Sequence, residues 1–92
     1  MTAGVTHKPK VRDDLVFRQL DDEWVVYDPA GEQLHVMNGS AAVVWLHCTG
    51  DFTVPEIIEE VARAYEYKVP RDRLDVDVAA AIRQFSEKAL LA

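Results

Sequence analysis

The chain has 92 residues, of which 49% are hydrophobic and 28% are charged. This length is typical of a single compact domain. The proportions of apolar and charged residues are those of a folded protein and exclude a disordered chain. Sixteen acidic against ten basic side chains give a net charge of −6, which disfavours binding to phosphate backbones and to anionic membrane surfaces.

The first twelve residues are polar, contain Gly4 and Pro9 and show no apolar periodicity. We therefore expect a flexible N-terminal arm over residues 1–12 and a single domain over residues 13–92. Three short runs rich in aromatic and β-branched residues follow at residues 15–20, 24–27 and 33–37. Turn-forming residues separate them, which predicts a three-stranded antiparallel meander with the third strand at an edge.

Helical periodicity begins after Asn38 and predicts three helices. The first, which Asn38 or Ser40 caps and Gly50 ends, has an apolar stripe at Ala41, Val44, Trp45 and Cys48. The second begins with the capping box of Thr53 and Glu56, and its stripe is Ile57, Ile58, Val61, Ala62 and Tyr65. The third, capped by Asp72, is expected to run to about Leu90 with a stripe at Leu74, Val78, Ala81, Ile82, Phe85 and Ala89. The predicted fold class is α+β, a sheet followed by three helices.

Catalytic and metal-binding patterns are not evident in the sequence. His47 and Cys48 are adjacent on a helix, where neighbouring side chains point about 100° apart, and Cys48 belongs to an apolar stripe. The three histidines and one cysteine match no zinc pattern, and the acidic runs lack the alternation of a calcium loop. We therefore expect no enzyme activity, no metal and no cofactor. A lone cysteine without a secretory signal or a bilayer-spanning apolar run favours a cytoplasmic location.

The predicted edge strand is the feature of the sequence that indicates a function. Unpaired backbone groups at a sheet edge can accept an extended peptide by β-augmentation. Two alternatives stay open at this point, since the third helix or a dimer partner could cover the same edge.

The residues from His35 to Ile57 resemble the signature stretch of the PqqD family. A histidine and an apolar residue precede Asn38, a helix start rich in small residues and Trp45 follow, and Gly50 then leads to the threonine-capped helix. Residues 24–29 upstream and 76–91 downstream are also similar to that family, so the resemblance covers about residues 12 to 91. It implies a winged-helix-like fold and a role as a peptide chaperone in the biosynthesis of pyrroloquinoline quinone or of another ribosomally made, modified peptide.

The resemblance also implies where a peptide binds. The leader of the precursor would pair with the third strand and pack toward the third helix, while a separate partner, such as a radical SAM enzyme or a leader peptidase, acts on the core peptide. Carried onto this chain, the expected site comprises Gln33, Leu34, His35, Val36, Met37, Asn38, Asp75, Val78, Ala79, Ile82 and Arg83. Val78 and Ile82 would form an apolar floor, although internal packing is an equal alternative, and Arg83 would meet an acidic leader residue.

Three other functions are weighed against this one. A winged helix can bind DNA, but the third predicted helix carries four acidic against three basic residues, unlike a helix that neutralises phosphates. A hydrolase or transferase would need a concave site for which this short chain has little room. A plain dimerisation module, or homodimer, differs from the peptide-binding hypothesis only in what fills the edge.

Overall fold

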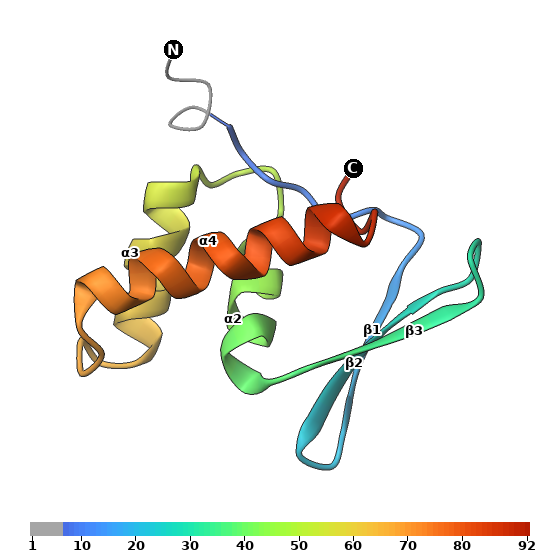
Figure 1. Ribbon diagram of the computed structural model, residues 1–92, viewed down its shortest axis with the longest axis horizontal. Coiled ribbons are helices and arrows are strands. Elements are labelled where there is room, and N and C mark those ends of the chain that lie inside the picture. Colours follow the sequence, from blue (N-terminus) through green and yellow to red (C-terminus); the bar gives the residue numbers. More distant parts are fainter. Residues whose placement is uncertain (1–6) are drawn as a thin grey trace.

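The computed structural model describes residues 7–92, which form a three-stranded sheet followed by three helices (Figure 1). The strands β1 (Val16–Leu20), β2 (Glu23–Asp28) and β3 (Gln33–Met37) pair antiparallel in the order β1-β2-β3. The helices are α2 (Gly39–His47), α3 (Val54–Ala64) and α4 (Arg71–Glu87). The α+β class, the meander and the edge position of β3 are confirmed.

The sheet has an inner face that packs against the helices. Val26 of β2 is fully buried in the main apolar cluster, against which Phe17 of β1 and Met37 of β3 also pack. Phe17 stacks on Trp45 of α2 with ring centroids 5.9 Å apart, and Trp45 meets Phe85 of α4 edge-on at 5.2 Å. Because side chains alternate along a strand, the residues between these positions lie on the outer face.

The predicted starts of the first two helices are confirmed. The side chain of Asn38 accepts a hydrogen bond from the amide of Ala41 at 2.9 Å and caps α2. The capping box of α3 is complete, since Thr53 accepts from the amide of Glu56 and the Glu56 carboxylate accepts from the amide of Thr53. Local chemistry therefore fixes both starts.

The third helix differs from its prediction at both ends. Pro70 is the N-cap of α4 and gives no side-chain hydrogen bond, so the predicted cap at Asp72 is wrong: this residue lies inside the first turn, where its charge still favours the helix dipole. The helix ends at Glu87, and Ala89 takes a positive φ of 58°. This turn redirects the chain so that Leu90, rather than Ala89, fills the core with no exposed surface.

Residues 7–12 differ from the flexible arm that we expected, whereas residues 1–6 lie outside the described part of the chain. Pro9 is fully buried, and Val11 forms an isolated β-bridge with Leu91. The guanidinium of Arg12 donates to both carboxylate oxygens of Asp28, each at 3.1 Å, and to the carbonyl of Ala89 at 3.0 Å. Tertiary contacts to both ends of the domain thus order a segment that has no apolar periodicity.

Candidate functional site

The edge of β3 that faces away from β2 has no strand partner among residues 7–92. Alternate residues of an antiparallel strand bond to each neighbour, and the two-residue connection between β1 and β2 makes the residues flanking it a hydrogen-bonded pair. Along β2, every second residue from Glu23 therefore bonds to β1, and the residues between them bond to β3. The backbone groups of their partners Gln33, His35 and Met37 point toward β2. We infer that the N–H and C=O groups of Leu34 and Val36 point outward, as a fourth strand would require.

A groove lies beside this edge, between β3 and the C-terminal half of α4. Its volume is about 140 Å³. The strand side and the start of α2 contribute His35, Val36, Met37, Asn38 and Ala41, and the other side contributes Gln84, Phe85, Lys88 and Leu90. The strand edge and an apolar hollow therefore adjoin, which is the arrangement that gives backbone pairing and side-chain selectivity together.

A second hollow of about 200 Å³ continues from the groove between α2, α3 and α4, and it shares Asn38, Ala41 and Gln84 with the groove. Its walls are mainly apolar and include Val44, Val61, Leu74 and Val78, while Ser40, Tyr65 and Asp77 add polar atoms. An apolar side chain with a hydrogen-bonding tip would match this lining.

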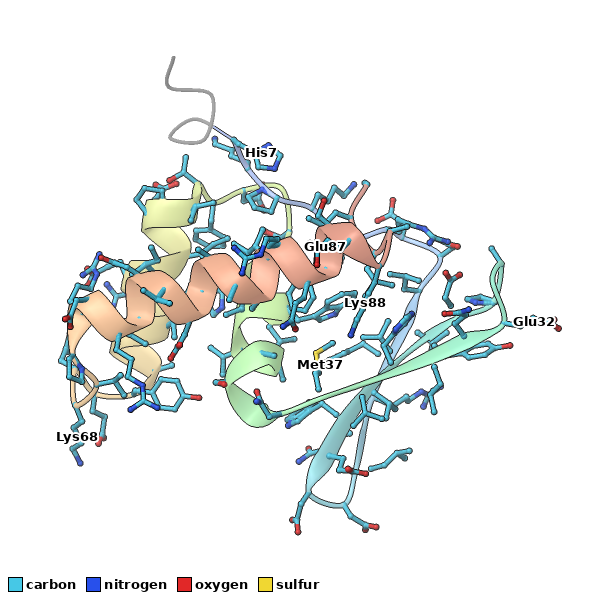
Figure 2. All side chains as sticks on the ribbon, in the orientation of Figure 1. His7, Glu32, Met37, Lys68, Glu87 and Lys88 are labelled. Atoms are coloured by element: carbon cyan, nitrogen blue, oxygen red, sulfur yellow. The ribbon has the colours of Figure 1, made fainter. Side chains whose placement is uncertain are left out.

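Lys88 supplies the cation of the groove. Figure 2 shows Lys88 and Met37 approaching the space between α4 and β3 from opposite sides. No carboxylate of residues 7–92 forms an ion pair with Lys88. The groove therefore offers a positive charge beside a strand edge.

The structure brings together only part of the site expected from the sequence. His35, Val36, Met37 and Asn38 line the groove, and Gln33 and Leu34 continue the same strand with exposed side chains. Val78 has 1% of its surface exposed and forms a wall of the second hollow, which agrees with the internal-packing alternative.

The other four α4 residues of the expected site line neither hollow. Ile82 is half-buried against the core, Ala79 and Arg83 are exposed, and Asp75 is exposed beside Arg71 at 3.6 Å. Their positions follow from the helical repeat: Ile82 and Asp75 lie on the flank of the buried stripe away from the groove, and Ala79 and Arg83 lie on the solvent-facing side of the helix.

The groove residues that sequence reasoning missed are Ala41 of α2, Gln84 and Phe85 of α4, and Lys88 and Leu90, which follow α4. Asp77, Ala81, Gln84 and Lys88 share one flank of the helix at spacings of four, three and four residues. This spacing is visible in the sequence, but it does not say which flank of the stripe turns toward β3.

The reactive side chain of Cys48 has a packing role. Cys48 is fully buried, and burial raises the pKa of its thiol to about 12. Its packing role is confirmed. His47 approaches the carbonyl of Val43 with Nδ1 at 2.8 Å within the same helix. Within the described residues no group of three or more His, Cys, Asp or Glu side chains is placed to hold a metal ion.

None of the helices formed by residues 7–92 combines the length and the apolar character that crossing a membrane requires.

Comparison with known proteins gives one family and two solved structures. Residues 23–91 match the model of the family described as PqqD, coenzyme PQQ synthesis protein D. The structure is similar to TbiB1 in complex with the TbiA(beta) leader peptide, with 24% identity, a TM-score of 0.72 and coverage of 89% of this chain and 93% of that chain. It is also similar to a lasso peptide synthetase B1 complexed with the leader peptide, with 19% identity, a TM-score of 0.76 and coverage of 92% and 98%. No curated protein matches the chain.

Proposed function

This chain belongs to the PqqD family, and we propose that it is a non-catalytic, cytoplasmic peptide chaperone that binds the leader of a ribosomally made precursor and presents it to a separate modifying enzyme. The observation that carries the proposal is the unpaired edge of β3 beside the groove of α4. Two proteins of the same fold were solved as complexes with leader peptides, which supports the same class of ligand here.

Binding would proceed by strand addition. An extended leader pairs antiparallel with β3, and the outward backbone groups of Leu34 and Val36 donate to and accept from its main chain. This ladder supplies affinity that depends little on the leader sequence. Because the edge is already formed in the free protein, little ordering of this chain opposes binding.

Selectivity would come from the groove. Leader side chains that alternate toward α4 contact Met37 and Phe85, and an apolar side chain can enter the adjoining hollow past Asn38. Lys88 favours an acidic leader residue near the C-terminal end of α4. Residues 7–92 bring no nucleophile and base together, so chemistry on the core peptide falls to the partner, such as a radical SAM enzyme or a leader peptidase.

Charge reversal at one end of α4 tests the proposal. The ligand is the fluorescently labelled leader of the precursor encoded beside this chain, and its anisotropy is followed during titration with the wild-type protein, Lys88→Glu and Arg83→Glu. Arg83 is a matched control because it is an exposed cation of the same helix outside the groove.

We expect Lys88→Glu to weaken binding by about 1.4- to fivefold at low salt, since an exposed charge pair contributes roughly 0.2–1 kcal/mol, and we expect the difference to shrink as salt rises. Arg83→Glu should bind like wild type. Equal weakening by both variants would indicate a general effect of net charge, and weakening by Arg83→Glu alone would move the leader to the opposite flank of α4. A wild-type protein that does not bind the leader would refute the proposed function.

A further inference from the structure

The outer face of the sheet carries an exposed apolar surface. Val16, Tyr27, Leu34 and Val36 have 38%, 41%, 59% and 54% of their surface exposed, and we call them the outer patch. The strand register places Tyr27 directly between Val16 and Leu34. None of the four packs against the main core cluster, whereas their neighbours Phe17, Val26 and Met37 do.

Four adjacent apolar side chains on one solvent-facing sheet surface differ from scattered exposed residues. Val25, in register with Arg18 on one side and Val36 on the other, lies on this same face and is 6% exposed. Contiguous apolar patches of this kind mark surfaces that bind another protein.

The outer patch is continuous with the proposed leader site. Leu34 and Val36 belong both to the patch and to the strand beside which the leader would lie. A leader added to β3 becomes a fourth strand, and every second side chain of that strand extends the same outer face. The inner face packs against the core cluster that contains Trp45 of α2 and Phe85 of α4. Within residues 7–92 the outer face is therefore the side of the sheet from which a protein can contact the patch and the bound leader together (Figure 1).

The charges around the outer patch distinguish between a second copy of this chain and a different protein as its partner. The turn between β1 and β2 carries Asp21 and Asp22, and Glu23 follows as the first residue of β2. The opposite turn carries Glu32, which Figure 2 shows at the far end of the β2–β3 hairpin. Within the described residues these carboxylates have no ion-pair partner. Two copies packed face to face would bring acidic ends together in either orientation, at a net charge of −6 each. The complementary partner is a surface with an apolar centre and a rim of Lys and Arg.

We propose that the outer patch is the docking surface for the modifying enzyme, which meets it with an apolar centre and a basic rim. This inference rests on the proposed function, because the enzyme is placed where it can reach a leader held on β3. The patch and the leader strand together form one surface, and the acidic turns at its two ends attract the enzyme and set its orientation.

The test measures two affinities on the same variants. Tyr27→Glu places a charge at the centre of the outer patch, and Tyr27→Thr removes the ring while keeping a residue that favours strands. Val76→Glu is the matched control, since Val76 is an apolar residue of α4 with 68% exposed surface outside the patch and both hollows. The enzyme encoded beside this chain is immobilised for binding by biolayer interferometry, and leader affinity is measured separately by anisotropy. Circular dichroism and mass in solution are recorded for each variant.

We expect Tyr27→Glu to lose at least tenfold in enzyme affinity and Tyr27→Thr to lose about threefold, with leader affinity unchanged and Val76→Glu like wild type. Unchanged enzyme affinity in both Tyr27 variants overturns the docking surface. So does a wild-type protein that binds the leader but not the enzyme, or one that is a dimer dissociated by Tyr27→Glu. If Tyr27→Glu alone is misfolded, Tyr27→Thr decides the outcome. A wild-type protein that does not bind the leader refutes the proposed function itself.

Discussion

Replacement of Val36 by proline isolates the backbone contribution of the β3 edge. Proline lacks the N–H that we infer to point away from β2, and prolines on edge strands are tolerated when that group is not bonded inside the sheet. Val36 has 54% of its surface exposed and lies outside the core cluster. The free energy of unfolding should therefore fall by less than about 1 kcal/mol.

The expected effect on leader binding is much larger. The variant loses one intermolecular hydrogen bond, with a net value of about 0.5–1.5 kcal/mol, and the leader carbonyl that accepted it loses its partner at a cost of roughly 1–3 kcal/mol. Because these two figures overlap, we expect a total loss of about 1–3 kcal/mol, equivalent to roughly 5- to 150-fold in Kd. Anisotropy titration of the labelled leader gives this ratio directly, and chemical denaturation gives the stability.

The matched control is Gln19→Pro on the opposite edge of the sheet. The same alternation turns the amide of Gln19 away from β2, and its side chain is exposed, so the chemical change to the sheet is equivalent. We expect this variant to bind the leader like wild type. Equal affinities for all three proteins would refute strand addition at β3, and weakening by Gln19→Pro alone would assign the leader to β1.

Three further predictions concern the fold that supports the site. Leu90→Ala should lower the free energy of unfolding by about 2–5 kcal/mol in urea denaturation, because a fully buried side chain outside any helix is lost, and a change below about 1 kcal/mol would contradict its core position. Hydrogen bonds from Arg12 hold the pKa of Asp28 below its ordinary value of about 3.8, so this carboxylate stabilises the fold above that pH and the effect is lost as pH falls through the lower folded pKa. Asp28→Asn should therefore lower Tm at neutral pH and make Tm decline less on acidification than in the wild-type protein. Plots of Tm against pH that run parallel for the two proteins would disprove the contribution of the Asp28 carboxylate. Cys48, whose pKa is raised to about 12, should react with a thiol reagent at pH 8 only at the rate of unfolding, and rapid reaction of the native protein would exclude its burial.

Local patterns in the sequence determined most of the fold. Alternating strand residues, the cap at Asn38 and the capping box of Thr53 and Glu56 act within a few residues of chain, so their outcome can be read without knowing the tertiary structure. The edge position of β3 follows in the same way, because short connections place consecutive strands side by side. The sequence therefore named the four residues from His35 to Asn38 that line the groove, as part of a strand that also includes Gln33 and Leu34.

The helix half of the site required the tertiary structure. The buried stripe of α4 at Leu74, Val78 and Phe85 has two flanks, and both carry small and charged residues. Lys88 lies on one flank and Arg83 lies on the solvent-facing side of the helix, and the sequence offers each as the cation of the groove. Only the way in which α4 packs against α2 and α3 decides which of the two cations lies beside β3, and that packing depends on how the side chains of all three helices interlock.

The two ends of the chain show the same division between local and long-range causes. Pro9 and Leu90 lie outside the helices and strands, yet both are fully buried. Backbone hydrogen bonds join Pro9 to Gly50 and Leu90 to Phe85 and Arg12. Periodicity reports residues that a helix or strand repeatedly turns inward. A single residue inserted from an irregular segment gives no such signal, so only the assembled fold decides that it belongs to the core.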